Sequence, residues 1–189
     1  ETAAEWLDLH RQAHALGIPS NATLLHGHYE TAAQRVDHLL ALRALQDESG
    51  GFLAFIPLSY HPENNTLKVE EGPSAAAELR VYAASRLLLD NFPHIKSYWI
   101  MLGLGTAQLA LNFGASDMDE TVRQERIYHM AGATTPQALS VPDLHRLIRA
   151  AGRDPLERDH LYRQVSRGPG GPEDWQTVPY ILRRGEGDC

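Results

Sequence analysis

The sequence predicts an α/β fold, the C-terminal portion of a (β/α) barrel in which three parallel βα units precede a helical C-terminal segment. Three runs of strand length, residues 20–26, 52–59 and 95–102, alternate with segments of helical periodicity. The middle run is almost wholly apolar, as is typical of a strand buried on both faces of a parallel sheet. Three such units cannot close a barrel and leave open strand edges, so we interpret them as part of a larger barrel.

The first element is a helix over residues 2–16. Thr2 and Glu5 form a capping box, apolar residues recur at helical spacing, and Gly17 ends the helix. A short strand, residues 20–26, follows the turn.

The second helix, residues 31–49, repeats the capping pattern in Thr31 and Gln34 and stops before two glycines. The run 52–59 then forms the central strand and opens into a polar loop, residues 60–65. In parallel α/β folds, ligands bind where the strands end, so we expect chemistry at this loop.

Ser74 is expected to cap a third helix that reaches Asp90. The buried face of this helix is predicted to consist of five apolar residues: Ala77, Val81, Ala84, Leu87 and Leu88. The run 95–102 is predicted as the third strand. The alternation of strands and helices predicts parallel strands joined by right-handed crossovers.

The pattern changes after residue 103. Helices are expected over residues 106–112, 121–130 and 140–151, and residues 113–120 form a turn-rich loop. We therefore expect three parts: a partial barrel (1–103), a C-terminal helical extension packed on it (104–166), and a flexible tail rich in glycine and proline (167–189).

The composition excludes several kinds of partner. The formal charge of −7 over 189 residues argues against a nucleic-acid backbone, and no apolar stretch is long enough to cross a membrane. Cys189, the only cysteine, cannot alone make a disulfide or a cysteine-based cluster. We expect a cytoplasmic protein whose ligand is a small molecule.

Candidate site residues gather where the predicted strands end. His61 is a candidate proton donor or carboxylate binder and Asn64 a hydrogen-bond clamp, although asparagines there also cap loops. His26 and His28 would share one face of an extended strand, and Gly27 would let a ligand approach the backbone. We favour a substrate- or cofactor-facing role for both histidines over a metal pair, because no third ligand is evident.

Other candidates lie along the strands. Asn21 and Thr23 share the other face of the first strand and would present polar groups to a cofactor, unless they form a polar layer of a barrel interior. Trp99 is more often core than a stacking platform. Lys96 could pair with a carboxylate, but a lysine at a strand entry more often lies in water.

An acidic cluster follows the third strand. Asp117, Asp119, Glu125 and His129 are predicted to form a wall of the substrate cavity. The alternatives are a hard metal site and a helix N-terminus with an i,i+4 pair of Glu125 and His129.

Taken in order, six segments resemble radical S-adenosylmethionine enzymes of the futalosine route to menaquinone, most closely the aminodeoxyfutalosine synthase branch. They are NATLLHGHYET, RVDHLLALRALQDESGGFLAFIPLSYHPENN, SRLLLDNFPHIKSYWIMLG, AQLALNFGASDMDET, ERIYHMAGA and GRDPLERDHLY. The resemblance implies a partial TIM-type barrel, S-adenosylmethionine and a [4Fe–4S] cluster. It also implies addition of the 5′-deoxyadenosyl radical to 3-[(1-carboxyvinyl)oxy]benzoate, and places Glu30 and Gln108 among the binding positions.

This chain departs from the pattern in two places. The cluster-binding cysteine triad is absent, so the chain alone should not cleave S-adenosylmethionine. Asp119-Glu120-Thr121 stands where relatives usually have Asp-Gly-Thr.

Three alternatives to the synthase stay open. Two are sister enzymes, the dehypoxanthine futalosine cyclase and the tyrosine hydroxyphenyl transferase of deazaflavin synthesis. The third is a non-catalytic half-barrel binding module. The expected partner is the N-terminal barrel half or a second copy of the chain.

Overall fold

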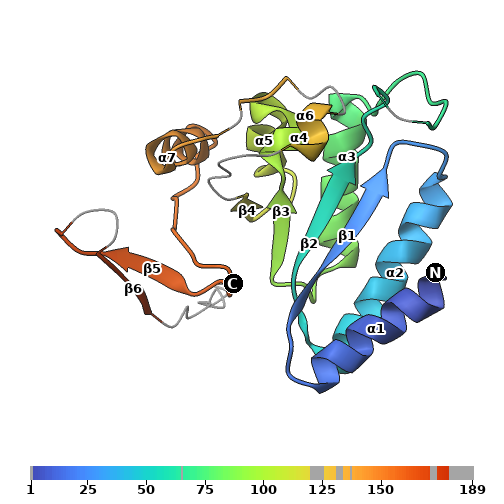
Figure 1. Ribbon diagram of the computed structural model, residues 1–189, viewed down its shortest axis with the longest axis horizontal. Helices are drawn as coiled ribbons and strands as arrows, with labels where there is room; N and C mark the ends of the chain where they lie inside the picture. The colour runs from blue at the N-terminus through green and yellow to red at the C-terminus, as the bar shows by residue number, and fades with distance from the viewer. Residues whose placement is uncertain are drawn as a thin grey trace, which may run out of the picture. The chain divides into compact units, whose positions relative to one another are not determined.

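A computed structural model describes residues 2–64, 66–119, 126–130, 134–136, 138–170 and 174–178 (Figure 1). The chain divides into two compact units, Glu1–Arg153 and Asp154–Cys189. Each unit is described by itself. None of the helices in the described ranges is both long enough and apolar enough to span a bilayer.

The first unit contains a parallel sheet of four strands, β1 (Ser20–His26), β2 (Phe52–Ser59), β3 (His94–Ser97) and β4 (Asp117–Met118). Their spatial order, β1-β2-β3-β4, is also their order along the chain. A doubly wound sheet reverses its strand order, whereas a barrel adds each strand beside the previous one. The parallel α/β fold is confirmed, and its strand order is that of part of a (β/α) barrel.

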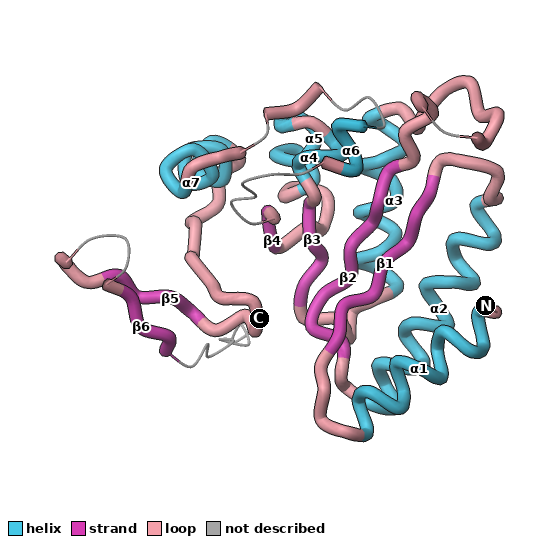
Figure 2. The backbone as a smooth tube through the Cα atoms, in the orientation of Figure 1, coloured by secondary structure: helices cyan, strands magenta, loops and turns pink. Residues whose placement is uncertain are grey.

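The three predicted N-terminal helices are present: α1 (Ala3–Ala15), α2 (Ala32–Ser49) and α3 (Ala75–Leu88) (Figure 2). The predicted capping boxes begin α1 and α2, and the Ser74 side chain accepts a hydrogen bond from the backbone N–H of Ala77. Gly50 ends α2 in the left-handed conformation with φ 62°.

The predicted third strand is too long. β3 ends at Ser97, and the following residues form a short helix, α4 (Trp99–Leu102), and then α5 (Leu104–Ala110). Gly103, with φ 75°, separates the two helices. The two-residue strand β4 lies in the segment predicted as a turn-rich loop.

One face of the sheet packs against the helices. On β1, Ala22, Leu24 and His26 are buried on this face, while Asn21, Thr23 and Leu25 are exposed on the other. We call the second face the open face; it also carries Ile56, Leu58 and Lys96, which share its side of β2 and β3. The hydroxyl of Ser97 donates to the carbonyl of Ala107 in α5, which places its neighbour Lys96 on the open face.

The buried face of α3 differs from the prediction. Its buried residues are Glu78, Val81, Tyr82 and Ser85, whereas Leu87 is 79% exposed. The Tyr82 hydroxyl donates to the carbonyl of Lys96. This polar contact helps to fix which face of α3 packs against the sheet. The apolar residues of α3 alone do not predict that face.

The remaining elements are α6 (Ile127–Met130), α7 (Val141–Ala150), β5 (Gln164–Arg167) and β6 (Trp175–Val178). α7 begins with the predicted capping box of Ser140 and Asp143. β5 and β6 pair as an antiparallel hairpin in the second unit, so part of the segment expected to be a flexible tail is a strand. The expected boundary between residues 166 and 167 falls inside β5.

Candidate functional site

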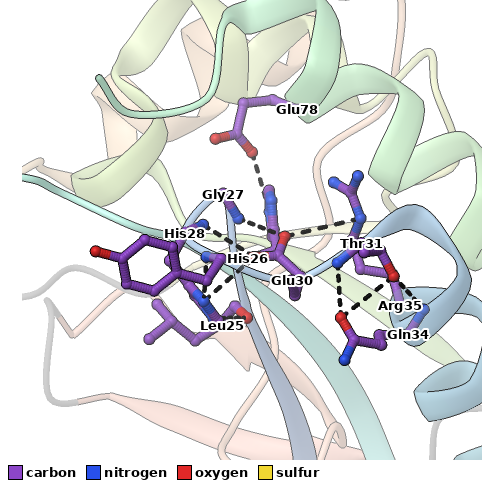
Figure 3. A network of polar contacts seen from close by, with 10 residues as sticks. Leu25, His26, Gly27, His28, Glu30, Thr31, Gln34, Arg35 and Glu78 are labelled. Carbon is purple, nitrogen blue, oxygen red and sulfur yellow. Dashed lines mark hydrogen bonds and ion pairs between the residues drawn. The ribbon is translucent and has the colours of Figure 1, made fainter. Parts of the chain in front are cut away.

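The turn that follows β1 is built around one carboxylate. Glu30 accepts hydrogen bonds from the backbone N–H groups of Gly27, at 2.7 Å, and His28, at 2.9 Å (Figure 3). The guanidinium Nε of Arg35 lies 3.8 Å from the same carboxylate. Burial raises the pKa of Glu30, but the bonds from the two N–H groups outweigh it, and the pKa lies below its ordinary value. Glu30 is thus a structural anchor of the turn in this arrangement.

Gly27 does not leave room for a ligand. Its φ of 89° is left-handed, and a Cβ at this position would lie 2.6 Å from Cδ of Pro73. The ring of Pro73 fills the space that the sequence suggested for a ligand, so that expectation is wrong. The contact fixes the loop before α3 against the end of β1.

His26 and His28 do not face the same way, contrary to prediction, because β1 ends at His26 and the positive φ of Gly27 breaks the strand alternation. His26 is 0% exposed, and its Nε2 lies 3.2 Å from Oε2 of Glu78 in the first turn of α3. His28 turns back along β1: its Nε2 donates to the carbonyl of Leu25 at 3.2 Å. His26 is therefore buried between β1 and α3. His28 lies outside this buried position.

The loop after β2 is tied to two later helices. His61 Nε2 donates to the carbonyl of Met101 in α4 at 3.1 Å, and Asn64 Nδ2 donates to the carbonyl of Met130 in α6 at 2.9 Å. His129, beside Met130, donates from Nε2 to the carbonyl of Thr135 at 2.8 Å. The structure thus brings Asn64, in the loop after β2, close to the short helix that carries His129, a predicted site residue far along the sequence.

The open face carries a buried ion pair of Lys96, the alternative that sequence reasoning raised but did not favour. Lys96 Nζ lies 2.9 Å from Oδ1 of Asp119, and the two side chains are 10% and 8% exposed. Asp117 pairs with Lys96 in the β3–β4 register. Sequence reasoning favoured a position in water for Lys96. Its two neighbours in β3, Ile95 and Ser97, are both buried, and a lysine inside such a short strand was the available signal for a buried position.

Two further candidates lie on the open face, away from the strand ends. Asn21 and Thr23 are exposed there, on the strand face opposite to His26. Asn21, however, stands near the start of β1, roughly 16 Å from His26 by the rise of a strand. Asn21 is therefore separated from the strand-end residues in this arrangement.

Two of the remaining candidates, Trp99 and Gln108, contact other parts of the first unit. Trp99 is 0% exposed within the hydrophobic core, in line with the packing alternative. Gln108 donates from Nε2 to the carbonyl of Leu147 in α7 at 2.8 Å, which links α5 to α7. Glu125 lies outside the described residues.

A groove of about 390 Å³ runs beside β1 and the first turns of α2. Its walls include Leu25, His28, Arg35 and His38. His38 Nε2 donates to the carbonyl of Thr23 at 3.0 Å, and burial lowers the pKa of His38. The groove therefore follows the outer edge of the sheet, where β1 has no neighbouring strand.

The expected cofactors differ in how well they fit. In the described ranges no three His, Cys, Asp or Glu side chains come together as metal ligands, and the sequence has one cysteine, Cys189. A [4Fe–4S] cluster therefore does not fit the ligands of this chain. For the polar groups of a small cofactor, the open face offers the hydroxyl of Thr23, while Lys96 and Asp119 are already paired with each other at 2.9 Å.

Comparison with known proteins gives consistent matches. A family model described as the CofH/MqnC C-terminal region matches residues 49–168. The chain is 52% identical over 168 residues to aminodeoxyfutalosine synthase of Thermus thermophilus, which covers 87% of this chain and 45% of the relative. It is 41% identical over 178 residues to 5-amino-6-(D-ribitylamino)uracil–L-tyrosine 4-hydroxyphenyl transferase 1 of Methanosarcina barkeri, covering 88% and 47%.

A third relative, cyclic dehypoxanthine futalosine synthase of Streptomyces coelicolor, is 40% identical over 185 residues, which covers 96% of this chain and 46% of the relative. The chain spans about half the length of the curated relatives it matches.

Proposed function

This chain belongs to the CofH/MqnC C-terminal family, and we propose that it forms the C-terminal half of an aminodeoxyfutalosine synthase. The observation that carries the proposal is the 52% identity to the Thermus thermophilus synthase over 87% of this chain. The transferase and the cyclic dehypoxanthine futalosine synthase, at 41% and 40% identity, are more distant. The strand order supports the same proposal, since it is that of a barrel segment.

The proposed reaction would break the bond between the sulfonium sulfur and C5′ of S-adenosylmethionine, release methionine, and join the 5′-deoxyadenosyl group to the enol-ether double bond of 3-[(1-carboxyvinyl)oxy]benzoate. Rearrangement with loss of the carboxylate carbon would then give aminodeoxyfutalosine. Bound S-adenosylmethionine would supply the 5′-deoxyadenosyl group, and the cluster that cleaves it would be held by cysteines of the other half of the protein. In this proposal the present chain binds and orients the substrate.

We assign the substrate wall to two groups of side chains. On the open face, Thr23, Lys96 and Asp119 would bind polar groups of the nucleoside or the substrate. At the strand ends, His61 would bind a substrate carboxylate or donate a proton, and Asn64 would clamp the loop. Both already donate to backbone carbonyls, so the proposal requires His61 to exchange the Met101 carbonyl for the substrate.

The proposed partner of this chain is the N-terminal half of the barrel. β1 is an edge strand of the described sheet. α1 has no buried residues: Leu9 within it is 61% exposed, and Leu16 and Ile18, just after it, are 77% and 55% exposed. Exposed apolar side chains beside an open strand edge are typical of an interface. We propose that the N-terminal half of the barrel covers them.

The test supplies that half. The chain would be joined to the portion of the Thermus thermophilus synthase that precedes the matched region, and iron and sulfide would be reconstituted without oxygen. The expected product from S-adenosylmethionine and 3-[(1-carboxyvinyl)oxy]benzoate is aminodeoxyfutalosine, identified by its mass. A folded, cluster-loaded protein that forms no product would reject the proposal.

Two controls make the outcome specific. His61→Gln should lower product formation while the cluster content stays the same, whereas His160→Gln, an exposed histidine of the second unit, should not. Turnover of dehypoxanthine futalosine or of tyrosine with 5-amino-6-(D-ribitylamino)uracil, in place of the enol ether, would assign the chain to a sister enzyme. A tight complex with no turnover of any of the three would favour a binding module.

A further inference from the structure

Both ends of the loop after β2 are held against the end of β1. At its start, the backbone N–H of Tyr60 donates to the carbonyl of His26 at 2.8 Å. At its end, a Cβ on Gly72 would lie 3.0 Å from the carbonyl oxygen of Tyr60, and Pro73 packs against Gly27. We call these residues the neck of the loop. Compact loops whose two ends lie close together frequently carry function.

Two candidate site residues lie just beyond the neck. His61 follows Tyr60 directly and donates to the carbonyl of Met101, and Asn64 donates to that of Met130. A change in backbone direction at the neck would move both side chains together, because they are on the loop that leaves it. The neck therefore determines where His61 lies.

A buried polar cluster lies beneath the neck. The ring of His26 faces the carboxylate of Glu78 in the first turn of α3 (Figure 3). The distance from Nε2 to Oε2 is 3.2 Å, an ion-pair contact without an aligned hydrogen bond. Both ring nitrogens of His26, Oε2 of Glu78 and the hydroxyl of Ser59 are buried without a hydrogen-bond partner among the described residues. Ser59 stands beside His26 in the β1–β2 register, so two strand ends and the start of α3 meet at this cluster.

Stability alone does not explain this pair. Burying polar groups without aligned hydrogen bonds is unfavourable, and apolar residues of similar volume in place of a buried ion pair are often neutral or stabilising. A carboxylate beside one ring nitrogen does, however, favour a single orientation of α3 against β1, whereas apolar side chains allow several. Glu78 and His26 are therefore better explained by the position that they impose than by the stability that they add.

We propose that His26 and Glu78 are positioning residues for the proposed reaction: their contact fixes the neck and thereby holds His61 at the substrate wall. The inference rests on the proposed function, because it takes His61 as a residue that faces the substrate. His26 lies on the face of β1 that packs against the helices, and the open face is the other one. The pair therefore acts through His61 and not on the substrate itself.

The first measurement is the stability of the 189-residue chain in urea. His26→Leu combined with Glu78→Met places apolar side chains of similar size in the pair. The unfolding equilibrium constant of this double variant should stay within about threefold of the original or fall below it. Glu78→Met alone leaves the buried imidazole without its partner and should raise the constant by about tenfold.

The second measurement follows the His61 ring by nitrogen NMR in the same chain. The double variant should change the signal of the Nε2 that donates to the Met101 carbonyl, although the chain remains folded. Ser85→Ala is the matched control. Ser85 is a buried polar residue of α3 that also lacks a hydrogen-bond partner among the described residues, roughly 10 Å from Glu78 by the rise of a helix. Its loss should leave the His61 signal unchanged.

The third measurement is turnover by the joined protein described above. The double variant should lower kcat/KM by about tenfold at unchanged cluster content, because a small displacement of a substrate-binding group is costly. Combined with His61→Gln, it should cause no further loss, since both changes remove the same contact with the substrate. A purely structural role would instead add its own loss to that of His61→Gln.

The inference is overturned if the double variant keeps the original His61 signal, or if its loss of turnover adds in full to that of His61→Gln. If the double variant does not fold, Glu78→Gln takes its place with the same expected results, because glutamine keeps the shape of the side chain and removes its charge. The ring signal does not depend on turnover. A joined protein that forms no product, but whose His61 signal responds to the double variant, would reject only the proposed function.

Discussion

At the scale of single residues, two contacts at the end of β1 and one beside β3 and β4 each depend on the chemistry of one residue. Glu30 closes the turn with its carboxylate, Gly27 takes a left-handed conformation against Pro73, and Lys96 neutralises Asp119 where little water reaches. Each contact gives a prediction with a matched control.

Glu30→Gln should weaken the fold in a pH-dependent way. The pKa of Glu30 lies below its ordinary value of 4.5, so its bonds contribute stability above pH 4.5, and this contribution disappears as the pH falls below that value. At pH 7 the loss should be about 1–2 kcal/mol. Urea unfolding at pH 7 and pH 4 measures it, with the exposed Glu70→Gln as control; an equal loss at both pH values would contradict the assignment.

Gly27→Ala should cost more than Gly17→Ala. Both glycines have positive φ, 89° and 74°, so alanine pays a backbone cost of about 1–2 kcal/mol at either site. A Cβ at Gly27 also meets the ring of Pro73 at 2.6 Å, while a Cβ at Gly17 meets nothing within 4 Å. Thermal unfolding of the two variants isolates the steric part; equal losses would mean that Pro73 moves freely.

Lys96→Met should destabilise the chain by about 3–5 kcal/mol, because it removes the ammonium group that lies 2.9 Å from the buried carboxylate of Asp119. The double variant with Asp119→Leu should regain most of that loss. Breaking the exposed pair of Arg43 and Asp90 by Asp90→Asn should cost less than about 1 kcal/mol. A small loss for Lys96→Met would show that Asp119 reaches water.

At the scale of elements, local sequence signals predict where helices begin, whereas other boundaries depend on tertiary contacts. Side-chain caps act within four residues, so the sequence alone revealed the starts of α1, α2, α3 and α7. The run after His94 is mostly apolar and fits both a strand and a buried helix. Only packing against the rest of the unit makes it β3 followed by α4.

The candidate site was predictable in location and not in contacts. Strand ends follow from chain order, and His28 and His61 each lie two residues after the end of one of two neighbouring parallel strands. Their partners depend on the reversal at Gly27 and on distant carbonyls such as that of Met101, which no local pattern encodes. The pairing of Lys96 with Asp119 is likewise a contact across strands.

α1 should loosen on mild acidification. Its His10 and His14 both bind the hydroxyl of Ser20 at 2.8 Å, and His14 also binds that of Ser49. Burial lowers the pKa of both histidines, with the charge of His14 as a smaller cause at His10. Their contribution to stability is therefore complete above the ordinary pKa of 6.5 and falls as the pH drops below it.

Hydrogen exchange of the amides of α1 measures this loosening at pH 7.5 and 5.5, after correction for intrinsic rates. α7, which has its own capping box, is the internal reference. His14→Gln should reduce the difference between the two pH values, and equal protection at both would contradict the prediction.

At the scale of the whole molecule, the chain is one half-barrel unit and a separate unit that contains a hairpin. The proposed division at residues 103 and 166 followed composition, which changes gradually, whereas the compact units follow contacts and divide after Arg153. The hairpin was not predicted because its strands are four residues each, in a segment rich in glycine and proline.

The order of the four strands also bears on how the polypeptide acquires its structure during synthesis. Each strand pairs with the strand that is synthesised just before it. Every new strand can therefore pair with one that is already present when it leaves the ribosome. No strand of this sheet must stay unpaired until a remote segment is translated, a situation that favours aggregation. The half-barrel can therefore be assembled step by step, from β1 toward β4.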